Sequence, residues 1–108
     1  MRKMIAHTPE PPYYAVIFSN IRTDIEDGYK ETSMEMVTLA TQQKGYLGHE
    51  SARNDLGITI SYWDSLESIR IWKQQTDHLL AQRMGREKWY SAYKTRICVV
   101  QRDYAFGL

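Results

Sequence analysis

The sequence predicts an α+β domain of the ferredoxin-like kind, with an antiparallel sheet and elements in the order β-α-β-β-α-β. Several short segments are rich in aromatic and β-branched residues, which favour strands. Two longer segments place apolar residues at helical spacing. The chain has 108 residues, of which 43% are hydrophobic and 25% charged, values typical of one compact domain. We therefore expect a proline-rich arm over residues 1–12 and a single domain over residues 13–108.

The first half of the chain divides into an arm, a strand and a helix. Residues 7–12 contain all three prolines, which fix φ and lack an N–H donor, so this segment is neither a helix nor a central strand. Residues 13–22 read as the first strand. A helix is then expected up to about Lys44, with Gly45 in a left-handed position at its end. One face of that helix carries an apolar stripe: Tyr29, Ser33, Met36, Val37 and Ala40.

The second half begins with a hairpin. Residues 47–53 and 58–63 read as strands, and residues 54–57, Asn-Asp-Leu-Gly, have the composition of a tight turn. A second helix is expected to open at Asp64, as N-cap, with an acidic partner at Glu67. It is expected to break near Thr76.

The end of the chain is expected to be a strand. A short turn of helix over residues 86–90 precedes it, and the strand itself covers residues 93–104.

The first and last strands are apolar on both sides. On the first strand, Ala15 and Ile17 point one way while Val16 and Phe18 point the other. Because the helices of this fold cover one face of the sheet, the second face needs another cover. We therefore predict a homodimer whose sheets pack face to face.

Composition excludes several classes of protein. A net charge of +1 gives no reason to expect a nucleic-acid or membrane partner. No apolar run approaches the roughly 20 residues that span a bilayer, and no signal peptide precedes the arm, so we expect a cytoplasmic protein. The single cysteine, Cys98, lies between apolar neighbours and is interpreted as a small buried side chain. No pair of histidines or cysteines has metal-ligand spacing, so no metal site is expected.

The chain is rich in aromatic residues, with eight tyrosines, three tryptophans and two phenylalanines. Most of these belong in a core. They would also suit an apolar cavity for a flat aromatic ligand, with polar points at Asn20, His49, His78 and Gln82. For the histidines the alternative is structural, with a ring nitrogen bonded to the backbone. Arg96, on the last expected strand, is a candidate for holding an anionic group, with an ordinary surface ion pair as the alternative.

The element order and one segment resemble the antibiotic biosynthesis monooxygenase domain family, of the dimeric α+β barrel superfamily. The segment is Ser61-Tyr62-Trp63-Asp64-Ser65-Leu66-Glu67-Ser68-Ile69, followed by Trp72-Lys73 and His78. The similarity covers nearly the whole chain after the arm. Residues 85–93 resemble an uncharacterised subgroup of the family.

This resemblance implies an oxygenase, in one of two forms. Some members are cofactor-free and oxidise phenols or quinols, whose own electrons reduce oxygen. In that form His78 or His49 would remove the substrate proton, while Trp72, Trp63 and Tyr62 would wall the pocket.

Other members degrade haem with an asparagine on the first strand, a tryptophan on the second helix and a histidine after it. Trp72 matches the tryptophan. The asparagine position falls at Phe18, with Asn20 two residues on, and the histidine position falls near Gln82, with His78 one helical turn earlier.

We therefore expect a small monooxygenase that oxidises a phenol- or quinol-like compound with O2, without metal or flavin. The alternatives are a haem-binding, haem-degrading monooxygenase and a non-catalytic module that binds a small ligand. The expected catalytic residues are His78, Trp72 and Asn20. The expected substrate contacts are Phe18, His49, Tyr62, Trp63 and Gln82.

Overall fold

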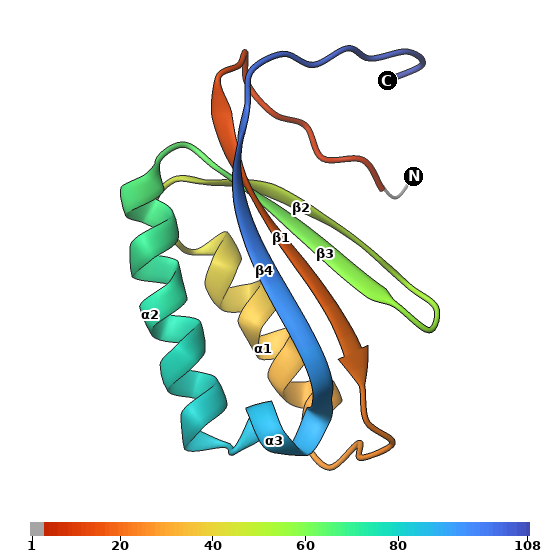
Figure 1. Ribbon diagram of the computed structural model, residues 1–108. Coiled ribbons are helices and arrows are strands. Elements are labelled where there is room, and N and C mark those ends of the chain that lie inside the picture. The colour runs from red at the N-terminus through yellow and green to blue at the C-terminus, as the bar shows by residue number, and fades with distance from the viewer. Residues whose placement is uncertain (1–3) are drawn as a thin grey trace.

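A computed structural model describes residues 4–108, so residues 1–3 of the expected arm lie outside the described residues. The elements are β1 (Tyr13–Arg22), α1 (Tyr29–Thr41), β2 (Tyr46–Arg53), β3 (Gly57–Trp63), α2 (Leu66–Gln82), α3 (Gly85–Trp89) and β4 (Tyr90–Val100). Four strands form one antiparallel sheet in the order β2-β3-β1-β4, and α1 and α2 pack on one face of it (Figure 1). The predicted α+β ferredoxin-like fold is confirmed.

The sheet register aligns the residues that face the helices. Phe18 lies opposite Thr59 on β3 and opposite Thr95 on β4. Two residues further along β1, Asn20 lies opposite Gly57 and Tyr93. Because side chains alternate along a strand, these two rows point to the same face, under α1 and α2.

Helix α1 ends earlier than the sequence predicts, at Thr41 instead of near Lys44. Gly45 does adopt a positive φ of 89°, but it does so in the turn that leads into β2. A Cβ atom on Gly45 would collide with the side chains of Asp64 and Ser68. The turn therefore needs glycine both for its backbone conformation and for the close approach of α2.

Helix α2 differs from the prediction at its start and in its middle. Its N-cap is Ser65, whose Oγ accepts a hydrogen bond of 3.1 Å from the backbone N–H of Ser68, so the expected cap at Asp64 is wrong by one residue. The expected break near Thr76 is absent. The Thr76 hydroxyl donates to the Lys73 carbonyl one turn earlier, which satisfies this polar side chain inside the helix.

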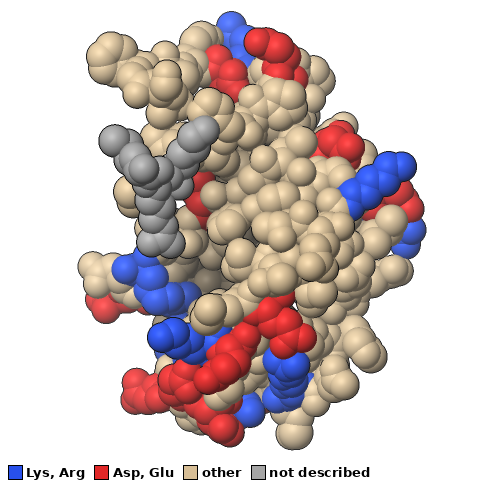
Figure 2. All heavy atoms as spheres, turned by 180° about the vertical axis from the view of Figure 1, so that it is seen from behind, with Lys and Arg blue, Asp and Glu red and all other residues tan. Residues whose placement is uncertain are grey.

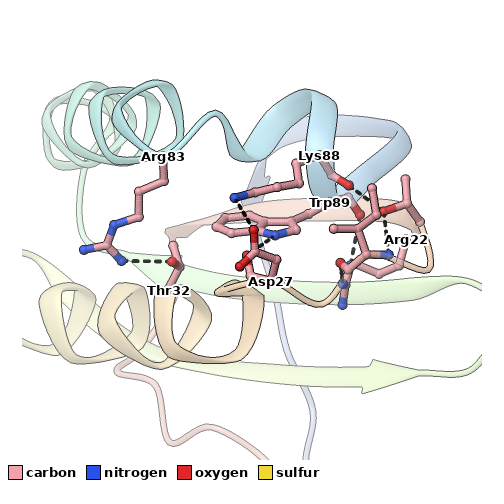
Figure 3. Close-up of polar contacts among 8 residues, drawn as sticks. Arg22, Asp27, Thr32, Arg83, Lys88 and Trp89 are labelled. Carbon is pink, nitrogen blue, oxygen red and sulfur yellow. Dashed lines mark hydrogen bonds and ion pairs between the residues drawn. The ribbon is translucent and has the colours of Figure 1, made fainter.

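The final strand covers Tyr90–Val100 instead of the expected residues 93–104. It begins earlier because Tyr90 already pairs with Arg22 of β1. A short helix, α3, makes the corner before it (Figure 3). Trp89 is only 1% exposed there, and its indole N–H donates to the Asp27 carbonyl at 3.0 Å. The Trp89 carbonyl accepts hydrogen bonds from the Arg22 side chain and the Thr23 N–H, both at 2.9 Å. These contacts tie the end of β1 and the start of α1 to α3.

The N-terminal arm and the C-terminal tail meet at the face of the sheet that carries no helix. The Ala6 N–H donates to Glu50 on β2 at 3.0 Å. Tyr13 accepts a hydrogen bond from Thr8 in the arm and donates to Asp103 in the tail at 2.6 Å, which leaves Tyr13 only 5% exposed. Beyond Asp103 the tail has no regular secondary structure and Phe106 is 99% exposed, and the tail lies on the same side of the molecule as the described part of the arm (Figure 1). Across residues 4–108, no helix has the length and apolar character to cross a membrane.

Candidate functional site

A cavity of about 540 Å³ lies between the sheet and the two long helices. This volume is within the range of small-molecule sites. The stripe predicted for the first helix, from Tyr29 to Ala40, lines it in full. Aromatic side chains form much of the remaining wall: Phe18, Tyr46, Trp72, Tyr90 and Tyr93.

A row of side chains that crosses the sheet forms the polar end of this cavity. Arg53, at the end of β2, lies opposite Gly57, and Gly57 lies opposite Asn20. The Arg53 guanidinium crosses over Gly57, where any Cβ atom would collide with it, and donates to the Asn20 side-chain oxygen. The Asn20 amide nitrogen donates to the Gly57 carbonyl at 3.4 Å. Asn20 is only 3% exposed, and both the oxygen and the nitrogen of its side-chain amide are hydrogen-bonded, as buried polar groups usually are.

A second polar group on the cavity wall pairs a tyrosine with a histidine. The hydroxyl of Tyr46 is hydrogen-bonded to Nδ1 of His49, across the bulge that interrupts the β2 pairing. Burial raises the pKa of Tyr46 above its ordinary value of 10.0, so the phenol remains protonated at neutral pH. When Nδ1–H donates to the Tyr46 oxygen, Nε2 of His49 carries a lone pair that can accept a proton.

Two tryptophans stack at the opposite end. The ring of Trp63 lies 5.9 Å from that of Trp72, with 30° between their planes. Trp63 is 0% exposed, and its indole N–H donates to the Ser61 hydroxyl at 2.9 Å. Trp72 faces the cavity, so Trp63 supports the wall from behind.

The tyrosines next to α3 form a packed aromatic corner. Tyr29 and Tyr90 meet edge to face at 6.2 Å, and the Arg22 guanidinium lies 3.2 Å from the centre of the Tyr29 ring. Burial raises the pKa of Tyr90, and its neighbour Tyr29 raises it further, so Tyr90 is a neutral hydrogen-bonding group at every physiological pH.

The structure brings together four of the eight residues singled out from the sequence. Phe18, Asn20, His49 and Trp72 all line the cavity. Trp63 lies directly behind it. Tyr62 is on the other face of the sheet, where it packs on Tyr13 and donates to Glu50 at 2.9 Å.

The other two residues, His78 and Gln82, are exposed on α2 outside the cavity. The face of α2 that lines the cavity runs through Ile69, Trp72, Thr76 and Leu80. Because each helical residue turns the side chain by about 100°, His78 and Gln82 point away from that face.

Arg53 and Tyr46 line the cavity as well, although neither was expected there from the sequence. Arg53 lies four residues after His49 on β2. Because side chains alternate along a strand, this even spacing already indicates that the two share one face of the sheet. The space above Gly57, which lets the guanidinium enter the cavity, depends on the register between β2 and β3. Arg96, considered for an anionic group, lies opposite Ile17 on the helix-free face and is exposed.

The residues of the cavity do not fit a haem held by an axial histidine from α2. His78 does not reach the cavity, and His49 comes from β2 with its Nδ1 already bonded to Tyr46. In the described part of the chain, no group of three or more His, Cys, Asp or Glu side chains is placed to hold a metal ion.

Comparison with known proteins agrees with this architecture. A mutant of SnoaB of Streptomyces nogalater, a cofactor-independent oxygenase, superposes with a TM-score of 0.68 at 10% identity over 84% of this chain and 95% of its own. A protein of Nitrosomonas europaea that is assigned to the antibiotic biosynthesis monooxygenases superposes with a TM-score of 0.63 at 13% identity, over 94% and 99% of the two chains. The fold is therefore that of the antibiotic biosynthesis monooxygenase class.

A relative with a similar sequence identifies the family to which the chain belongs. The uncharacterised protein YqjZ of Bacillus subtilis, strain 168, is 46% identical over 108 residues, which cover 98% of this chain and 95% of YqjZ. The chain belongs to the same family as YqjZ. No family model matches the chain.

Proposed function

We propose that this protein is a small oxygenase that oxidises a phenol- or quinol-like compound with O2, without metal or flavin. The observation that carries the proposal is the aromatic-walled cavity of about 540 Å³ with the Tyr46–His49 pair on its wall. A flat electron-rich ring fits between aromatic walls, and a histidine with a free Nε2 suits the removal of a phenolic proton. SnoaB, which shares the fold, is described as a cofactor-independent oxygenase.

The reaction needs only the substrate and O2. His49 accepts the phenolic proton, and the resulting phenolate donates electrons to oxygen far more readily than the phenol does. A C–O bond forms at the ring carbon para to the oxygen, and the C–H bond there breaks. One oxygen atom of O2 becomes the second quinone oxygen and the other leaves as water, so the ring loses four electrons and O2 gains four. The walls around Trp72 and Phe18 exclude bulk water from the reactive intermediate.

The test is oxygen uptake with phenol and 1-naphthol, which both carry a C–H bond para to the hydroxyl group, in the presence of a chelator. We expect uptake above the uncatalysed rate by a colourless protein, with a quinone product and no release of hydrogen peroxide. His49→Gln should abolish most of this activity, and His78→Ala tests the competing histidine. Absence of uptake with every compound would overturn the proposal. Binding without uptake would favour the non-catalytic module instead.

We also propose that two copies pair through the helix-free face of the sheet. Apolar side chains of three strands, Ile17, Ile60 and Val100 among them, lie on this face and are only partly covered by the arm and tail. The tail also holds Tyr104 and Phe106 84% and 99% exposed. A domain of this size buries only about two thirds of its unfolded surface, so burying these side chains against a second copy would add to its stability. Sedimentation velocity tests the pairing directly.

A further inference from the structure

The cavity carries an excess of positive charge. Three basic side chains line it, Arg53, Lys73 and Arg86, against one acidic side chain, Asp77. Asp77 is paired with Lys73 at 2.5 Å. Among residues 4–108, no carboxylate lies within 4.0 Å of the guanidinium groups of Arg53 and Arg86. In an apolar cleft, such an excess attracts a ligand of the opposite charge.

Arg53 is held in place without being neutralised. Its partner inside the cavity is the side-chain oxygen of Asn20, a neutral acceptor that is itself only 3% exposed. Gly57 leaves the space in which the guanidinium lies. An arginine that serves only solubility would extend into water. Arg53 is exposed as a whole, but its guanidinium is bonded across two strands to Asn20 with its charge unpaired, so it lies at the mouth of the cavity with further N–H donors for a ligand.

Arg86 lies at the same end of the cavity as Arg53. Tyr93 lies opposite Asn20 across the β1–β4 pairing, whereas the next residue, Lys94, points to the helix-free face, as Arg96 does. The Arg86 guanidinium lies 6.0 Å from the centre of the Tyr93 ring. Arg86 belongs to α3, whose position is fixed by the Trp89 hydrogen bonds (Figure 3). On the face shown in Figure 2, acidic and basic side chains lie together at the lower end of the molecule.

We propose that the ligand of this cavity is an aromatic carboxylate, whose carboxylate group binds Arg53 while its ring lies between the aromatic walls. A guanidinium matches a carboxylate with two parallel hydrogen bonds, a geometry that a neutral phenol cannot use. The proposal rests on the proposed function in one respect, since it names the substrate class of the same cavity.

The spacing along β2 sets the size of the ligand. His49 and Arg53 are four residues apart on one strand face, a span of roughly 13 Å between their Cα atoms. Both side chains extend from there into the cavity. A two-ring compound with a hydroxyl group at one end and a carboxylate at the other can reach the proton acceptor and the guanidinium together.

The test compares two ligands that differ only in charge, 6-hydroxy-2-naphthoate and 6-hydroxy-2-naphthamide, by isothermal titration calorimetry. The wild-type protein is expected to bind the carboxylate about 10- to 100-fold more tightly, the usual range for a charge-assisted hydrogen-bonded pair. Arg53→Met should reduce this preference to about twofold or less. Gly57→Ala, which retains the arginine but fills its space, should also reduce it. Arg70→Met removes an exposed arginine on α2 and should leave the preference unchanged. Circular dichroism of each variant reports whether it is folded.

Equal affinity of the wild type for the two ligands, or a preference that survives Arg53→Met in the folded variant, would overturn the inference. Failure of the proposed function looks different. If the carboxylate binds with the expected preference but no phenol or quinol supports oxygen uptake, the ligand class stands and the oxygenase does not. If uncharged phenols support uptake and the carboxylate has no advantage, the oxygenase stands and the ligand class does not.

Discussion

Replacing Trp63 by phenylalanine should destabilise the protein while leaving its ligand site intact. Trp63 is 0% exposed, so the smaller ring leaves a gap that costs about 1–2 kcal/mol. The variant also loses the 2.9 Å hydrogen bond to Ser61, worth about 1 kcal/mol. The centre of the Trp63 ring lies 5.9 Å from that of Trp72 and 5.7 Å from that of Tyr46. The smaller phenylalanine ring would pack less well on both, at a further cost of about 0.5 kcal/mol. The expected loss is therefore about 2–4 kcal/mol, a large share of the roughly 5–15 kcal/mol typical of a domain.

The matched variant is Trp72→Phe. Trp72 is half-buried and faces the cavity, so its replacement should cost only about 1 kcal/mol of stability but should weaken aromatic ligand binding. Urea unfolding followed by far-ultraviolet circular dichroism gives the free energies without relying on tryptophan emission. All samples need the same protein concentration, because pairing of copies changes the apparent stability.

The two variants should thus have opposite profiles. If Trp63→Phe loses less than about 1 kcal/mol, the indole is not the buried support that the structure describes. If Trp63→Phe abolishes ligand binding at unchanged stability, then Trp63 contacts the ligand itself, and the assignment of Trp72 as the wall is wrong.

Four further predictions can be checked independently. His49→Gln should lower the oxygenation rate by about 10²- to 10⁴-fold with little change in melting temperature, and an equal loss in His78→Ala would contradict the role of His49. Burial and the hydrogen bond to Glu50 raise the pKa of Tyr62 from 10.0 to about 12. The protonated Tyr62 hydroxyl therefore contributes fully to the free energy of unfolding below pH 10, and this contribution is lost as the pH rises to 12. Unfolding in urea at stepped alkaline pH should show this slope and a shallower one in Tyr62→Phe. Gly85→Ala would place a Cβ atom 2.5 Å from the ring of Trp89 and should cost about 1–3 kcal/mol in the same assay, and no change would show that the α3 corner is loose. Wild-type protein should sediment at twice its 12.7 kDa and Val100→Glu as a single chain, whereas wild type at 12.7 kDa would refute the pairing.

The order of elements was predictable because it depends on local periodicity. The alternation in residues 13–22 and the stripe from Tyr29 to Ala40 each need only neighbours in sequence, and both occur as predicted. Element ends were less predictable. Several adjacent polar residues could have capped α2 or ended α1. The packing of α2 against the turn at Gly45 decides that the cap is Ser65 and that α1 ends at Thr41.

Part of the candidate site was also readable from the sequence. Phe18, Asn20 and His49 could be placed on one face of the sheet by alternation alone, and the structure brings them to one cavity. His78 could not be placed in this way. A shift of one or two residues on a helix moves a side chain by 100° or 200°, and only the packing of α2 decides which residues face inward.

The sequence by itself determined the elements, their order and the two apolar faces of the first strand, because these follow from the chemistry of residues close together in the chain. Only the tertiary structure decided that Arg53 crosses Gly57 to reach Asn20, a contact between residues 33 positions apart. That contact depends on the register of three strands, and register is fixed by the sum of all packing across the sheet. The charge inside the cavity is therefore a property of the fold that no local pattern contains.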